Sequence, residues 1–181
     1  MGKFLTLLNQ ELMDFIRRQP MFFVASAPGA EGRVNVSPKG LDTLRILGPD
    51  SVAYLDLSGS GNETAAHIRD NGRLTLMFCS FGETPLILRL YGRGWVVIQD
   101  DSRWDELIGA FEPMAGQRQI IGLAIESVQT SCGFGVPLME LTAQRATLPR
   151  HAGKKDAQLL KQQWYGRNAH SIDGLPSPFA P

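Results

Sequence analysis

The chain has 181 residues, of which 43% are hydrophobic and 20% are charged, as in folded globular proteins. Its 18 Lys and Arg residues equal its 18 Asp and Glu residues, so no excess charge favours nucleic acid or an anionic membrane as a partner. No apolar run is long enough to cross a bilayer, the N-terminus lacks a secretory pattern, and only two cysteines occur. We therefore expect a single cytoplasmic domain over residues 1–181, with no nucleic acid and no membrane as partner.

The first third of the chain predicts one helix followed by short strands. Residues 4–18 carry apolar side chains at helical spacing, and Pro20 ends the pattern. The alternation of residues 33–37 is typical of a strand with one buried face, and the turn at 28–32 makes a hairpin with the preceding run. Strands are expected at residues 21–27, 33–37, 43–47 and 51–57.

The glycine-rich residues 58–64 (SGSGNET) connect the last of these strands to a helix. Ser60 and Glu63 have the spacing of a capping box, and Gly72 is expected to end the helix in a left-handed conformation. Free backbone N–H groups and the positive end of the helix dipole would attract an anion there, near Lys39 if the two strands pair. One interpretation is a phosphate-bearing cofactor, and the other is an ordinary strand-to-helix connection.

The second half of the chain predicts the centre of the sheet. Strands are expected at residues 74–80, 86–98 and 119–128, and helices at residues 102–111 and 152–165. Gly92 and Gly94 interrupt the long second strand, as they do at bulges and barrel corners. The tail, residues 171–181, contains too much proline and glycine for a helix, so we expect it to lie extended on a surface.

These elements together predict a mainly β (α+β) protein. Short connections between consecutive strands favour antiparallel order, and the interrupting glycines favour closure into a small barrel with flanking helices. The core is expected over about residues 20–145, with a C-terminal helix and extended tail over residues 146–181.

Several classes of chemistry are excluded by the motifs. His67, His151 and His170 are far apart in sequence and have no metal-ligand spacing, so no metal site is expected. There is no Gly-x-Ser-x-Gly elbow, and the glycines at residues 59–61 form neither a dinucleotide fingerprint nor a Walker loop. We assign no catalytic acid or base.

Three polar clusters remain as candidates for binding. The first is Asn35, Ser37 and Lys39, which strand alternation places on one face of the strand or at its exit; its alternative is a solvated strand face. The second is the glycine turn at residues 59–64. The third is residues 129–133, whose small donors could bond the edge of a heterocycle; its alternative is a plain loop.

These segments, in this order, resemble the pyridoxamine 5′-phosphate oxidase-like family of flavin-binding split barrels. The resemblance covers about residues 5–145 and is closest to an uncharacterised branch. It rests on VNVSPKG, AYLDLSGSGNETAAHI, NGRLTLMFC, LILRLYGRG and QTSCGFGVP. It implies a six-stranded antiparallel split β-barrel, a two-fold homodimer, and FMN bound in clefts between the subunits.

The resemblance also implies which residues bind the cofactor. Lys39 matches a lysine at a strand end, and residues 62–64 stand where the oxidases carry a Ser-Arg-Lys phosphate clamp, which is missing here. Trp164 and Arg167 are loose counterparts of the oxidases' C-terminal Trp and Arg, so the chain is not expected to be a pyridoxamine phosphate oxidase proper. The expected cofactor-binding residues are Asn35, Ser37, Lys39, Tyr54, Leu55, Gly61, Asn62, Glu63, Thr64, Gln129, Thr130, Ser131 and Cys132.

The function expected from this resemblance is that of an FMN-dependent oxidoreductase acting on a small organic molecule. The flavin would carry the chemistry, and the protein would orient it and exclude water. The alternative is a split barrel that binds a flavin, a deazaflavin or haem without turnover, as a sensor or store. The missing clamp favours the alternative somewhat.

Overall fold

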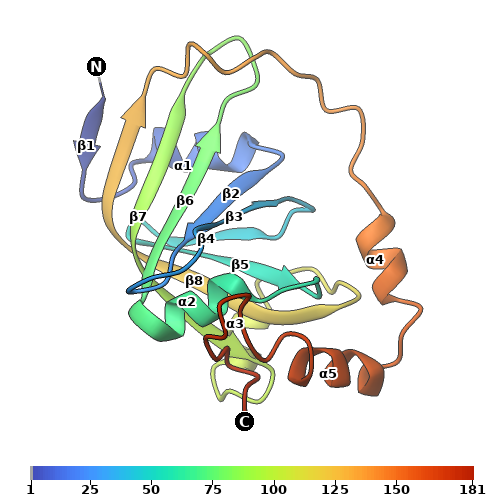
Figure 1. Cartoon of the computed structure of the whole chain (residues 1–181). Coiled ribbons are helices and arrows are strands. Elements are labelled where there is room, and N and C mark those ends of the chain that lie inside the picture. The colour runs from blue at the N-terminus through green and yellow to red at the C-terminus, as the bar shows by residue number, and fades with distance from the viewer. Residues whose placement is uncertain (1) are drawn as a thin grey trace.

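The computed structural model describes residues 2–181, and one curled antiparallel sheet organises them (Figure 1). The strands are β1 (Lys3–Leu5), β2 (Phe22–Ser26), β3 (Asn35–Lys39), β4 (Leu44–Gly48), β5 (Ser51–Leu57), β6 (Arg73–Cys79), β7 (Ile87–Ile98) and β8 (Gln117–Ser131). The helices are α1 (Gln10–Arg18), α2 (Glu63–Asn71), α3 (Trp104–Ile108), α4 (Thr147–Ala152) and α5 (Ala157–Tyr165). None of these helices has the length and hydrophobicity needed to span a membrane.

The sheet curls until its two ends meet. Its strand order is β3-β2-β6-β7-β8-β5-β4, so β3 and β4 lie at opposite ends of the hydrogen-bonded path. Residues 40–43 alone connect them, which forces the two edge strands close together in space. No ladder joins β3 to β4 among the described residues, and the barrel is therefore split at this seam.

The longest strand, β8, holds the barrel together. One edge of β8 pairs with β7, while the other edge pairs with β1 near the end of β8 and with β5 near its start. The backbones of β7 and β8 come very close together at Gly92. A Cβ at this position would lie 2.0 Å from the carbonyl oxygen of Ala124, so only glycine fits. The register shifts directly before Gly92, which confirms the bulge predicted from this glycine.

Two apolar clusters occupy the two sides of the curled sheet. The larger cluster lies inside the barrel, where α1 contributes Leu12, Phe15 and Ile16. The smaller one lies under α3, and its centre includes Trp104 and Phe111. Both sides of β5 are thus covered, which explains why nearly all of its residues are buried.

The structure confirms the antiparallel split-barrel class with flanking helices, with eight strands where six were expected. The first helix begins later than predicted, because Asn9 caps it by accepting a hydrogen bond from the Leu12 N–H at 2.9 Å. The preceding residues of β1 pair with β8 instead. The expected end of α2 is confirmed, since Gly72 has a φ of 74°.

The C-terminal region departs most from expectation. The strand predicted at 119–128 is longer at both ends, from Gln117 to Ser131. The helix predicted at 152–165 begins later, as α5, and the preceding helix α4 was not predicted. Residues 132–146, which we call the strap, run extended from β8 across the barrel to α4 (Figure 1). From here on, the tail means all residues after α5, 166–181. It is not simply spread on the surface, because Ser177 and Phe179 are buried.

We predict that Gly122 is essential for the packing of β7 against β8. A Cβ at this position would lie 1.9 Å from Cζ2 of Trp95, so Gly122→Ala must displace the indole. We expect a loss of about 1–3 kcal/mol in the free energy of unfolding, measured by urea denaturation. Gly109→Ala is the matched control, because a Cβ there meets nothing within 4 Å. Equal stability of the two variants would contradict this account.

Candidate functional site

A cavity of about 670 Å³ opens where β3, β5, the start of α2 and the C-terminal tail come together. Its volume lies within the usual range of small-molecule sites, roughly 300–1,000 Å³. The lining residues come from four separate parts of the sequence: Asn35, Ser37, Pro38, Lys39, Asp56, Leu57, Gly59, Ser60, Gly61, Asn62, Glu63, Thr64, Arg118, Ile121, Arg167, His170, Ser171 and Ile172.

Strand β3 supplies one polar wall of this cavity. Asn35, Ser37 and Lys39 are alternate residues, so their side chains share one face of the strand, as predicted. Ser37 donates to the Asn35 Oδ1 at 3.2 Å, and the Asn35 amide donates to the Thr64 hydroxyl at 3.1 Å. These bonds join β3 to the first turn of α2.

The first turn of α2 supplies a second wall. Asn62 is the N-cap residue, yet its side chain makes no capping bond, because its Oδ1 accepts from Gln119 at 2.6 Å. The predicted capping box is wrong: both Glu63 carboxylate oxygens accept from the backbone N–H of Ile172, at 3.0 and 3.1 Å. The helix start is therefore left without the side-chain acceptors that usually cap it.

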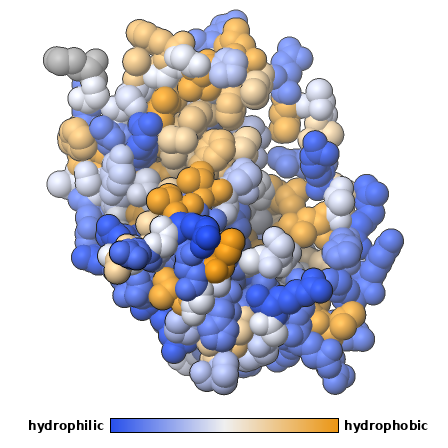
Figure 2. Space-filling view, in the orientation of Figure 1, coloured by the Kyte–Doolittle hydropathy of each residue, from blue (hydrophilic) through white to orange (hydrophobic). Residues whose placement is uncertain are grey.

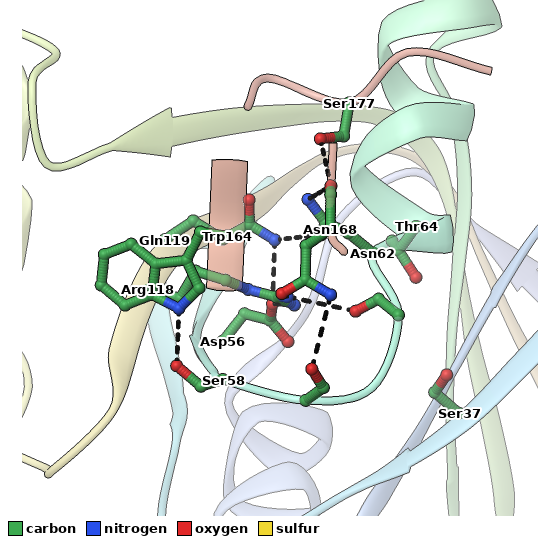
Figure 3. Close-up of polar contacts among 12 residues, drawn as sticks. Ser37, Asp56, Ser58, Asn62, Thr64, Arg118, Gln119, Trp164, Asn168 and Ser177 are labelled. Carbon is green, nitrogen blue, oxygen red and sulfur yellow. Dashed lines mark hydrogen bonds and ion pairs between the residues drawn. The ribbon is translucent and has the colours of Figure 1, made fainter. Parts of the chain in front are cut away.

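The floor of the cavity is a buried ionic network around Asp56, which is 2% exposed (Figure 3). Its carboxylate pairs with the Lys39 ammonium at 2.7 Å and with the Arg118 guanidinium at 2.5 Å, and it accepts from Gln119 at 2.8 Å. A β-bulge makes this possible. Asp56 pairs with Gln119 and Leu57 with Gln117, so Arg118 is the extra residue on β8.

The network keeps Asp56 ionised. Burial acts to raise the pKa of this carboxyl, but the charges of Lys39 and Arg118 outweigh it, and the pKa lies well below its ordinary value. Tyr54, the next but one residue along β5, behaves in the opposite way. Burial, reinforced by the negative charge of Asp56, raises the pKa of Tyr54, so its phenol stays neutral.

The C-terminal segment completes the network through Asn168, which is fully buried. The Asn168 Oδ1 accepts from the Arg118 guanidinium at 2.8 Å, and its backbone oxygen accepts from the Ser177 hydroxyl at 2.6 Å (Figure 3). Trp164 of α5 adds a further link, because its indole N–H donates to the Ser58 hydroxyl at 2.7 Å. The tail is thus part of the cavity wall.

The structure brings together seven of the residues expected at the cofactor. Tyr54 and Leu55 are not among the lining residues, because both are buried within the apolar clusters; the neighbouring Asp56 and Leu57 line the cavity instead. The residues that do line it are Asn35, Ser37, Lys39, Gly61, Asn62, Glu63 and Thr64.

The third predicted cluster, residues 129–133, lies away from this cavity. Gln129, Thr130 and Ser131 belong to the last part of β8, between β1 and β7, and exposed Cys132 follows them. None of the four lines the cavity described above. Ser131 accepts from Arg89 at 3.0 Å, and Gln129 accepts from the hydroxyl of Tyr91 at 2.9 Å, so this cluster is a half-buried patch on β7 and β8.

Sequence reasoning missed the residues that organise the site. The sequence does contain a sign that Asp56 is important: its carboxylate lies inside the apolar run SVAYLDL, and it must have a cationic partner if that strand is buried. No local pattern in the sequence indicates Arg118 or Asn168. A β-bulge determines the position of Arg118, and a contact between distant parts of the chain determines that of Asn168. Arg167 had only the loose match to the oxidases' C-terminal Arg, and His170 and Ile172 could not be placed at the cavity from sequence.

Metal-ligating side chains do not gather into groups of three or more anywhere in residues 2–181. His67 is fully buried on α2, where its Nδ1 lies 3.0 Å from the Ser26 hydroxyl. His67 is buried because α2 turns this face toward the end of β2.

An antiparallel split barrel with a polar cavity beside a helix start is the architecture of one class of cofactor-binding proteins, and comparison with known proteins identifies the family. The family model "Pyridoxamine 5′-phosphate oxidase" matches residues 8–132. A pyridoxamine 5′-phosphate oxidase family protein, ustO of Aspergillus flavus, is 41% identical over 93% of this chain and 75% of its own length. The chain belongs to the pyridoxamine 5′-phosphate oxidase family.

Solved structures show the same fold at lower identity. HupZ of Group A Streptococcus has a TM-score of 0.53 at 20% identity, over 67% of this chain and 91% of its own. A putative pyridoxamine 5′-phosphate oxidase from Lactobacillus delbrueckii has a TM-score of 0.52 at 18% identity, over 68% of this chain and 98% of its own. These likenesses support the split-barrel fold.

We predict that Asp56 makes folding stability depend on acid pH. Its pKa is lowered in the folded state, so its contribution is fully present above the unfolded value of about 3.9 and is lost as the pH falls below it. Asp56→Asn leaves Arg118 buried without its carboxylate, and we expect a cost of about 3–5 kcal/mol at neutral pH.

The measurement is urea unfolding of both proteins between neutral pH and the acid limit. The stability difference between wild type and Asp56→Asn should shrink as the medium becomes acidic. Asp105→Asn, on the exposed surface of α3, is the matched control and should follow the wild type throughout. A difference that stays constant with pH would show that Asp56 is not the titrating group.

Proposed function

We propose that this protein is an FMN-dependent oxidoreductase that acts on a small organic molecule. The observation that supports the proposal is the 670 Å³ cavity, which combines hydrogen-bond donors, cationic side chains and a helix start within the split barrel of this family. When bound, a flavin supplies hydride and electron transfer, and the protein's part is to bind, orient and shield it.

The lining residues fit such a cofactor in their chemistry. The hydroxyls of Ser37 and Thr64 and the start of α2 are suited to an anionic, hydrogen-bonding ligand. Leu57, Ile121 and Ile172 add apolar surface of the kind that a flat ring requires. The cavity therefore offers a polar end and an apolar wall.

The buried network fixes the residues that would touch the ligand. Lys39 is held by Asp56 at 2.7 Å and lies over the ring of Tyr54, 5.6 Å from its centroid. Arg118 also lines the cavity, and its guanidinium is held in place by Asp56 and Asn168. A donor that is already oriented loses little freedom when a ligand binds, which favours affinity and a single binding geometry.

The same proposal includes a homodimer in which a second copy adds to each cavity. The strap exposes large apolar side chains that its own chain leaves uncovered, including Phe134 at 81% and Leu138 at 73% exposure. In Figure 2, apolar residues gather over the upper half of this face, where Figure 1 places the strap and the upper ends of β6, β7 and β8. Contiguous apolar surface of this kind is typical of protein interfaces.

A dimer would also give a role to the patch on β7 and β8. Gln129, Ser131 and Arg89 form a hydrogen-bonding surface that does not line the 670 Å³ cavity of their own chain. In a dimer these residues would face the cavity of the partner subunit and supply hydrogen-bond donors to the edge of a heterocycle, as expected of residues 129–133. Thr130 and Cys132 would lie next to them.

We expect the purified protein to be yellow, or to become so with FMN. Under anaerobic conditions an NAD(P)H donor should bleach the flavin absorption, and air should restore it. Mass analysis of the ligand released on denaturation identifies the cofactor. A flavin that binds but is not reduced would favour the non-catalytic alternative, and failure of the protein to bind any flavin would refute the proposal.

We predict that the strap is needed for the dimer. Replacing both Leu138 and Leu141 with Ser should give a monomer in sedimentation velocity at micromolar concentration, because it removes apolar contact area at the interface. The fold should persist by circular dichroism, since both residues are exposed in the single chain. Leu159→Ser, at an exposed position of α5, is the matched control; dimers in both variants would contradict the prediction.

A further inference from the structure

The cations around the cavity differ in whether their charge is already balanced. Lys39 and Arg118 both pair with Asp56, and Arg118 also donates to Asn168 and to the Gly61 carbonyl oxygen. Arg167 lines the same cavity, yet its guanidinium has neither an ion pair nor a hydrogen bond with any residue of the described chain 2–181. It is the cation whose charge remains available to a ligand.

The anions at the cavity are both engaged. Asp56 is bound by two cations, and the Glu63 carboxylate is held by the backbone N–H of Ile172, which belongs to the tail. The tail therefore does two things at the start of α2: it fixes the carboxylate that would repel a phosphate, and it brings Arg167 and His170 to the same cavity.

The position of Arg167 is set by buried neighbours. Asn168 is fully buried and bonds to Arg118, and Ala169 is 4% exposed, so the backbone that carries Arg167 is held against the barrel. The side chain itself is exposed. A long cationic side chain on a fixed backbone can reach an anionic group without a costly ordering of the chain.

We propose that the C-terminal tail supplies the phosphate-binding cation of this site, with Arg167 pairing with the phosphate of the bound FMN and His170 beside it. This inference rests on the proposed flavin binding. A phosphate monoester carries about −1.5 to −2 charges at neutral pH, and guanidinium groups bind it through two parallel hydrogen bonds. Lys39, by contrast, contributes a charge already shared with Asp56.

The test compares FMN with riboflavin, which differ only by the phosphate. Flavin-free full-length protein is titrated with each ligand and binding is followed by quenching of flavin fluorescence. In Arg167→Ala we expect FMN affinity to fall at least about tenfold while riboflavin affinity is unchanged. His170→Ala should show a smaller effect of the same kind. Arg150→Ala removes an exposed arginine of α4 outside the cavity and should change neither affinity.

Each other outcome is decisive. An unchanged ratio of FMN to riboflavin affinity in Arg167→Ala overturns the assignment and leaves the proposed function intact. Equal weakening of both ligands also overturns it, because Arg167 would then contact a part that the two flavins share. If the wild-type protein binds neither flavin, the proposed function and this inference fail together. Lys39→Ala is a poorer test, because it also leaves Asp56 with one partner fewer.

Discussion

The arrangement of side chains at this site depends on one buried carboxylate, that of Asp56. A buried charge is tolerated only when it is paired and hydrogen-bonded, and Asp56 has two cations and an amide around it. The partners come from two other strands: Arg118 and Gln119 from β8, which pairs with β5, and Lys39 from the end of β3, which does not pair with β5. The electrostatic requirement thus fixes three strands relative to one another where the barrel is split.

The same requirement links the C-terminal tail to the barrel. Arg118 has donors left after binding Asp56, and Asn168 and the Gly61 carbonyl oxygen accept from them. Asn168 in turn holds the tail through Ser177. Because each of these side chains is buried, removing one leaves others unsatisfied, and the network behaves as a unit. Contacts from Asn168 and Arg118 to the backbone of residues 59–61 therefore help to determine the conformation of this turn, together with its glycines.

The sequence was informative where local patterns decide the structure. Alternation predicted the shared face of Asn35, Ser37 and Lys39, and Gly72 and Gly92 predicted a helix end and a bulge. It failed where distant contacts decide. The spacing of Ser60 and Glu63 indicated a capping box, but the tail offers Glu63 a better partner in the N–H of Ile172. Nothing in the sequence of residues 171–181 shows which surface that tail will meet.

The arrangement explains how a cavity floored by a carboxylate can still suit an anion. Asp56 is neutralised from two sides, and Glu63 is turned to the backbone of the tail, so neither carboxylate is left unpaired at the cavity. Two positive groups remain for a ligand: the start of α2 and the exposed guanidinium of Arg167. The site suits an anion because its negative charges are satisfied within the fold before a ligand arrives.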